Sequence, residues 1–201
     1  MMPSEYYEES VRRGTEFQQQ NKSWAGYDVV KYQKCIKDLV DRYHAKTLLD
    51  YGCGKGLQYK ERLPYGGSAG HELPLDQWQT FDQYLGVDVY CYDPCVAGFE
   101  TLPPPGTKFD GVICTQVLNS IPDADMTWVR ELLESYTDKF CFVGINFQRE
   151  AKGKKSLYNS EYFQVPRTRQ FFKSHYRRSE EHTSELQSHS DLVCRLLLEK
   201  K

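Results

Sequence analysis

The chain has 201 residues and a formal net charge of −2, and 39% of its residues are hydrophobic while 27% are charged. This size and balance are typical of one globular domain, and the near-neutral charge gives no general attraction to nucleic acid or anionic membranes. No apolar run approaches the roughly 20 residues of a membrane-spanning helix, and residues 1–20 lack the apolar centre of a signal peptide, so we expect a cytoplasmic protein with no membrane partner.

The first quarter of the chain leads to a short strand. Residues 1–20 are polar and are predicted to form a loose helix. A second helix is predicted from Asp28, as its cap, to about His44, because apolar residues recur there at helical spacing. A strand is predicted over residues 47–50, and a further helix can begin after it, over residues 57–62.

The next hundred residues continue this alternation. Residues 64–83 and 101–106 are rich in glycine or proline and are predicted to be irregular. Three more strands are predicted, over residues 84–92, 109–114 and 139–147. Asp123 or Asp125 is predicted to cap a helix before the last strand. Strands that alternate with helices indicate an α/β fold with an open, mostly parallel sheet.

A glycine-rich turn follows the first predicted strand directly, in the run Asp50-Tyr51-Gly52-Cys53-Gly54-Lys55-Gly56. Glycines let the chain turn sharply and let a ligand lie against bare backbone. A helix that starts after such a turn offers free N–H groups and a partial positive charge. Since ligands of open α/β sheets lie beyond the carboxyl ends of the strands, this turn is the predicted binding site.

Three uses of such a turn can be separated by spacing. A phosphate-binding P-loop requires G-x-x-x-x-G-K-[ST], but Lys55 is followed by Gly56. A dinucleotide fingerprint counted from Gly52 requires glycine at position 57, which is Leu57. The remaining pattern, two apolar residues and then acid-x-Gly-x-Gly-x-Gly, resembles motif I of the class I S-adenosylmethionine-dependent methyltransferases. A glycine-rich turn that binds no ligand is the alternative.

The resemblance covers about residues 28–147, and it implies a Rossmann-like fold and S-adenosyl-L-methionine as cofactor. No metal site is expected, because the cysteines lack zinc-type spacing. In this family a carboxylate at the end of the second strand binds the ribose hydroxyls. Asp88 and Asp93 are the candidates here. Asp88 fits a familiar Gly-Val-Asp ending, whereas Asp93 stands where the apolar run stops, and we favour Asp93.

Residues 109–118 resemble the family's fourth motif, whose end lies beside the methyl donor. Many members that act on small molecules continue with Glu-His, but this chain continues with Asn119 and Ser120, so no role for that pair carries over. The segment 93–109 is also short for the helix and strand usually found there. The cofactor-binding residues that the resemblance implies are Asp50, Gly52, Cys53, Gly54, Gly56, Asp88 or Asp93, Cys114, Thr115 and Gln116.

The expected activity is methyl transfer (class EC 2.1.1) to a small or medium-sized acceptor, with no catalytic base assigned. One alternative is a nucleic-acid methyltransferase that uses the basic, aromatic-rich segment 149–177. That segment also fits an ordinary solvated loop and helix. Another alternative is a cofactor-binding module without turnover. Residues 24–27 can cover the cofactor as an aromatic lid or pack into the core. The seven cysteines show no zinc-type pairing and are expected to be reduced.

The end of the chain has an unusual origin. Residues 178–188 and 191–201 match, in frame and in order, the two halves of a common short-read sequencing adapter, and two residues stand between them where a sample index belongs. We therefore expect an environmental sequence with one methyltransferase domain over residues 1–177, including an N-terminal extension or lid over 1–27, and a non-native tail over 178–201. The sheet is then expected to be truncated before the antiparallel hairpin that usually closes it.

Overall fold

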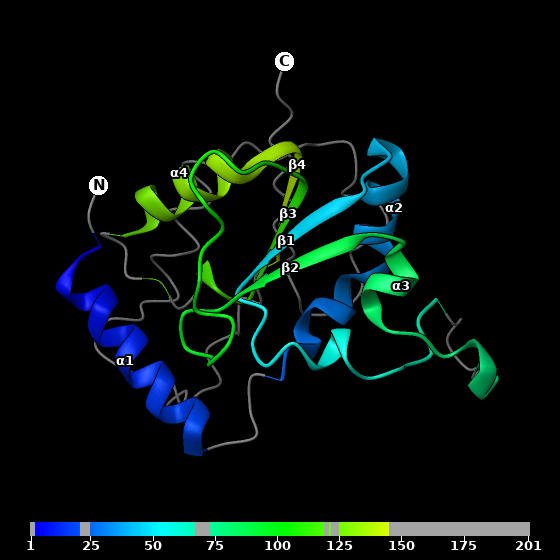
Figure 1. Cartoon of the computed structure of the whole chain (residues 1–201), viewed down its shortest axis with the longest axis horizontal. Coiled ribbons are helices and arrows are strands. Elements are labelled where there is room, and N and C mark those ends of the chain that lie inside the picture. The colour runs from blue at the N-terminus through cyan, green and yellow to red at the C-terminus, as the bar shows by residue number, and fades with distance from the viewer. Residues whose placement is uncertain (1–2, 21–24, 67–72, 119–120, 122–124, 145–201) are drawn as a thin grey trace, which may run out of the picture.

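The computed structural model describes residues 3–20, 25–66, 73–118, 121 and 125–144. Within these ranges an α/β arrangement is present, with one sheet and helices on both of its faces (Figure 1). The predictions for the basic segment 149–177, the tail 178–201 and the closing hairpin lie outside the described residues, as does the prediction of a cap at Asp123.

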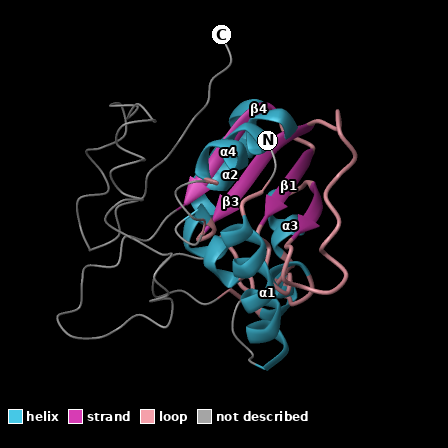
Figure 2. Cartoon of the chain, turned by 90° about the vertical axis from the view of Figure 1, so that its left-hand side faces the viewer, coloured by secondary structure: helices cyan, strands magenta, loops and turns pink. Residues whose placement is uncertain are grey.

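Among the described residues, four parallel strands form the sheet in the order β2-β1-β3-β4. Their bounds are Thr47–Tyr51 for β1, Asp88–Tyr92 for β2, Phe109–Thr115 for β3 and Thr137–Gly144 for β4. The strands all point the same way (Figure 2). The predicted α/β class with a parallel sheet is thereby confirmed, and the fold is Rossmann-like.

The order of the strands creates a topological switch point. From β1 the chain moves outward to β2, and it then returns across β1 to β3 and β4. The connections therefore diverge between β1 and β3, and a crevice beyond the carboxyl ends of the strands is expected at such a point. Both the glycine-rich turn and residues 116–118 follow strands that flank this point.

Helices cover the two faces of the sheet separately. On one face lie α1 (Glu5–Gln20) and α4 (Met126–Tyr136), and on the other lie η1 (Tyr27–Tyr32), α2 (Gln33–Tyr43) and α3 (Phe81–Leu85) (Figure 1). Side chains alternate between the two faces of the sheet along β1, so the strand contributes to the core on each face. Leu49 packs under α1 and α4, and Leu48 packs under α2 and α3.

Three predicted boundaries were wrong. Asp28 does not cap a long helix: the chain enters a 3₁₀ helix, η1, after Gly26 in the left-handed region, and Asp28 pairs with Lys31 instead. The helix expected over 57–62 is only one 3₁₀ turn, η2 (Leu57–Tyr59).

The third error concerns the start of the second strand. Residues 84 and 85 belong to α3, which a capping box of Thr80 and Gln83 begins and which Gly86 ends with a left-handed φ of 74°. The strand starts only at Asp88. Asp125 does directly precede α4, but its carboxylate binds Ser4 and Trp128 and makes no side-chain cap.

Candidate functional site

The glycine-rich turn, residues 52–56, leaves β1 at the carboxyl end of the sheet. Gly52, Gly54 and Gly56 all have positive φ, at 87°, 58° and 62°, where side chains are strained. The N–H of Gly52 donates to the carbonyl of Tyr92 at 2.7 Å. A β-carbon on Gly52 would lie 2.0 Å from Val117 Cγ2, so the segment after β3 passes directly against the turn.

Asp93 joins this turn from the neighbouring strand. It follows β2 directly and is 8% exposed. Its Oδ2 accepts the N–H of Gly54 at 2.9 Å, and its Oδ1 accepts the N–H of Cys95 at 2.9 Å. Burial raises the pKa of this carboxyl group, and the two N–H donors act in the opposite direction.

Asp88, the other candidate, lies at the wrong end of the same strand. It is the first residue of β2, it is paired in register with Thr47, and its N–H donates to the carbonyl of Lys46. A strand of this length puts Asp88 roughly 13 Å from the carboxyl end of β2. Of the two candidates, only Asp93 adjoins the glycine turn.

Asp50 is buried beneath the turn with an exposure of 1%. Its Oδ2 accepts hydrogen bonds from the Tyr59 hydroxyl at 2.7 Å and from Gln58 Nε2 at 3.2 Å. Its Oδ1 is buried without a hydrogen-bond partner in the structure. Burial raises the pKa of Asp50 to about 6, against the lowering effect of the two donors. Gln58 and Tyr59 were not predicted, because an isolated polar residue in a short turn carries no periodic signal.

The predicted residues at the end of β3 also face the switch point. Cys114 and Thr115 are buried, and burial keeps the pKa of the Cys114 thiol well above its usual value. Gln116 has a φ of 60°, which is strained for a residue with a side chain. Its Nε2 donates to the Tyr32 hydroxyl at 3.2 Å, and its N–H donates to the carbonyl of Gly144 at 2.8 Å.

Cys53 occupies the middle of the turn and is buried. Its Sγ donates to the carbonyl of Gly54 at 3.4 Å. Contact with Cys91 and burial raise the pKa of this thiol far above its ordinary value, so it stays protonated. The described cysteines are free thiols, and no group of three or more His, Cys, Asp and Glu side chains in the described ranges could hold a metal ion.

The segment 25–27 packs against the turn, whereas Trp24 lies outside the described residues. Leu57 donates its N–H to the carbonyl of Ala25 at 3.0 Å. A β-carbon on Gly26 would lie 2.5 Å from the carbonyl oxygen of Cys53. The predicted covering segment therefore has a direct contact with the glycine-rich turn.

The charge of this site restricts its ligands. Asp50 and Asp93 are both buried beside the turn, and the charge of Asp93 adds to the effect of burial in disfavouring ionisation of Asp50. An anion placed next to these two carboxylates would meet repulsion at low dielectric constant, whereas Lys55 within the turn and Lys60, whose Nζ donates to the Lys55 carbonyl at 3.3 Å, bring positive charge to the turn. A ligand with hydroxyl donors or positive charge would instead stabilise the carboxylates and could satisfy Asp50 Oδ1, which a phosphate group could not do.

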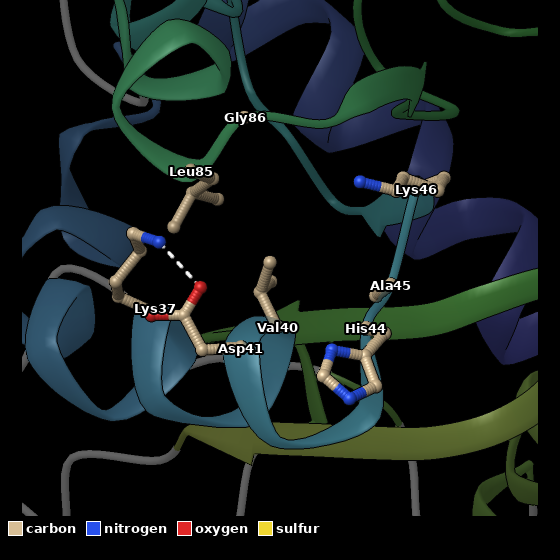
Figure 3. Close-up of a pocket in the computed structure, with 8 residues that line it drawn as sticks. All are labelled: Lys37, Val40, Asp41, His44, Ala45, Lys46, Leu85 and Gly86. Atoms are coloured by element: carbon tan, nitrogen blue, oxygen red, sulfur yellow. Dashed lines mark hydrogen bonds and ion pairs between the residues drawn. The ribbon is translucent and has the colours of Figure 1, made fainter.

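A separate pocket of about 450 Å³ lies at the opposite, amino-terminal end of the strands (Figure 3). Its lining residues are Lys37, Val40, Asp41, His44, Ala45, Lys46, Leu85 and Gly86. Asp41 neutralises Lys37 through an ion pair of 2.5 Å. The carboxyl end of α2 adds partial negative charge there. These effects oppose the positive charge of Lys46, and the pocket is not part of the glycine-turn site.

No protein-family model and no curated protein sequence matches this chain. None of the helices in the described ranges is both long enough and apolar enough to cross a membrane.

Proposed function

We propose that this protein is a class I S-adenosylmethionine-dependent methyltransferase that acts on a small or medium-sized acceptor. The observation that carries the proposal is the meeting of the turn 52–56 with Asp93 beside the switch point of a parallel sheet. An acid-x-Gly-x-Gly-x-Gly turn after the central strand and a carboxylate after its outer neighbour are the two features that the resemblance requires together.

The residues present suit this cofactor. Asp93 offers carboxylate oxygens to the two ribose hydroxyls, at the cost of weakening its bonds to the N–H groups of Gly54 and Cys95. The unpartnered Oδ1 of Asp50 suits a ligand with an ammonium or sulfonium charge. The turn has neither the spacing of a P-loop nor that of a dinucleotide fingerprint, which argues against a nucleoside triphosphate or a dinucleotide at the same place.

In this proposal the bound cofactor supplies an electrophilic methyl group on its sulfonium sulfur. The residues of the chain bind and align the reactants. The turn 52–56 receives the nucleoside, Asp93 fixes the ribose, and Asp50 supports the positively charged end. Thr115 and Gln116, the latter bonded to Tyr32, would border the methionine end of the cofactor. We assign no general base.

Isothermal titration of the full chain tests the proposal. S-adenosylmethionine and S-adenosylhomocysteine are expected to bind, and NAD and ATP are expected to bind more weakly than either. Tighter binding of NAD or ATP would reject the assignment. Transfer of a labelled methyl group to a mixture of small acceptors then separates an enzyme from a module that binds without turnover.

A further inference from the structure

Gln58 has an unusual position for an amide side chain. It stands in η2, directly after the glycine turn, and its exposure is 0%. Its Nε2 donates to Asp50 Oδ2 at 3.2 Å and to the carbonyl oxygen of Cys53 at 3.3 Å. A single amide group thus ties the carboxylate at the end of β1 to the backbone of the turn.

The other end of the same amide faces the segment 25–27. A β-carbon on Gly26 would lie 2.0 Å from Gln58 Oε1, so only glycine lets this segment approach the amide so closely. The adjacent bond from the Leu57 N–H to the Ala25 carbonyl fixes the same contact through the backbone. Gln58 therefore touches three separate parts of the site.

The orientation of the amide follows from its acceptors. Turning the group over would bring Oε1 against a carboxylate and a carbonyl, which cannot donate a hydrogen bond. In the observed orientation Oε1 is buried without a partner, which is itself unfavourable. A buried amide that keeps one atom unsatisfied costs stability relative to an apolar side chain, so its presence needs a reason beyond packing.

We propose that Gln58 is a positioning residue, which holds Asp50, the glycine turn and the segment 25–27 in the arrangement that receives the ligand. Gln58 Nε2 and the Tyr59 hydroxyl both donate to Asp50 Oδ2, which leaves Asp50 Oδ1 for the ligand. The identity of that ligand rests on the proposed function, but the positioning role does not.

Gln58→Met tests the role because it keeps the size of the side chain and removes both donors. Gln77→Met is the matched control, since Gln77 is exposed. In hydrogen–deuterium exchange without ligand, Gln58→Met should lower protection by about tenfold or more in residues 25–27 and 52–57, the scale of losing hydrogen bonds to a charged group. The protection of β3 and β4 should not change. Unchanged protection of residues 25–27 and 52–57 would overturn the proposal.

A second measurement uses S-adenosylhomocysteine as the probe across pH. Removing a donor from Asp50 disfavours its ionised form, so the pH at which affinity is lost on acidification should be higher in Gln58→Met than in the wild type. A purely structural role would lower affinity equally at every pH, and that result would reject the proposal. If the wild type does not bind the probe, the proposed function fails, while the exchange experiment still decides the role of Gln58.

Gln58→Glu covers the case in which Gln58→Met does not fold. Protonated, the introduced carboxyl group can still donate one hydrogen bond, but ionised it repels Asp50. Protection of residues 52–57, compared with the wild type at each pH, should therefore decrease as pH rises. Protection equal to that of the wild type at every pH would overturn the positioning role.

Discussion

Asp93 Oδ2 accepts the backbone N–H of Gly54 at 2.9 Å, which ties the end of β2 to the middle of the turn that follows β1. The bond joins residues 39 positions apart, so the two segments that form the site are held together without a ligand. A ribose diol must share this carboxylate with the backbone N–H of Gly54, or displace that N–H from the carboxylate. The strength of ligand binding therefore depends on Asp93 and Gly54 together.

Gly54→Val is expected to abolish the binding of S-adenosylhomocysteine. Gly54 has a φ of 58°, which a β-branched residue adopts only with strain, and the added side chain would occupy the surface that a ligand must approach. Isothermal titration measures the loss. Gly106→Val is the control, because Gly106 has a φ of 87° with no atom near its β-position and lies outside the turn. Equal affinity in the two variants would argue against a ligand on this turn.

Asp93→Ala is expected to weaken the same binding by about 1–3 kcal/mol, the scale of hydrogen bonds to a charged group. Asp88→Ala should leave the affinity unchanged, because Asp88 is exposed and lies at the amino end of β2. Titration of both variants makes the comparison, and thermal unfolding monitors folding. A larger loss in Asp88→Ala would mean that the ribose is bound elsewhere.

Ionisation of Asp50 is expected to lower the free energy of unfolding and to strengthen the binding of a cationic ligand as the pH rises. Its pKa is raised to about 6 by burial, whereas it is 3.8 unperturbed, so the folded state holds its proton more tightly than the unfolded state. Its contribution therefore destabilises the fold as pH rises from about 4 to 6, by on the order of 3 kcal/mol. Binding of a cationic ligand should strengthen over the same range.

Asp50→Asn separates these two effects. Removing the buried charge should make the free energy of unfolding less dependent on pH between about 4 and 6 and should weaken the binding of S-adenosylmethionine at pH 8. Denaturant unfolding at several pH values and titration check the two parts. Asp110→Asn is a suitable comparison, since the pKa of Asp110 is lowered by Lys139 and its stabilising effect is lost on acidification. An unchanged pH slope in Asp50→Asn would show that Asp50 is not the group responsible.

Asp125→Ala is expected to loosen α1 from the rest of the domain. The Asp125 carboxylate is 1% exposed and accepts hydrogen bonds from the N–H and hydroxyl of Ser4 and from Trp128 Nε1. Its loss leaves the partly buried donors of Ser4 and Trp128 unpaired, which costs about 1 kcal/mol. Chemical denaturation gives the change, and exposed Asp76→Ala should be neutral. Equal stability of the two variants would contradict an anchoring role.

The features that the sequence predicts well are local. The strand before the glycine turn and the turn itself are contiguous, so residues 47–56 could be interpreted without knowing the rest of the fold. The position of Asp93 followed from the end of an apolar run. The start of β2 could not be predicted, because the apolar pair at 84 and 85 suits a strand or a short helix equally. The Thr80–Gln83 capping box selects the helix.

Gln58 and Tyr32 show why the remaining site could not be predicted. Gln58 is buried, and the segment 25–27, some thirty residues earlier, packs directly against its amide group. Tyr32 meets Gln116 across 84 positions of sequence, and this pairing depends on η1 crossing one face of the sheet. Neither contact is encoded in a spacing, since each arises from how separate elements pack.

The central place of β1 has a consequence for synthesis of the chain. β1 is made early, yet its neighbours β2 and β3 begin only at Asp88 and Phe109, and Val117 is the residue that encloses Gly52. A nascent chain must therefore emerge beyond Val117 before the glycine turn is sheltered on both sides. Until then β1 exposes an apolar strand with no partner, at the stage when cotranslational aggregation competes with folding.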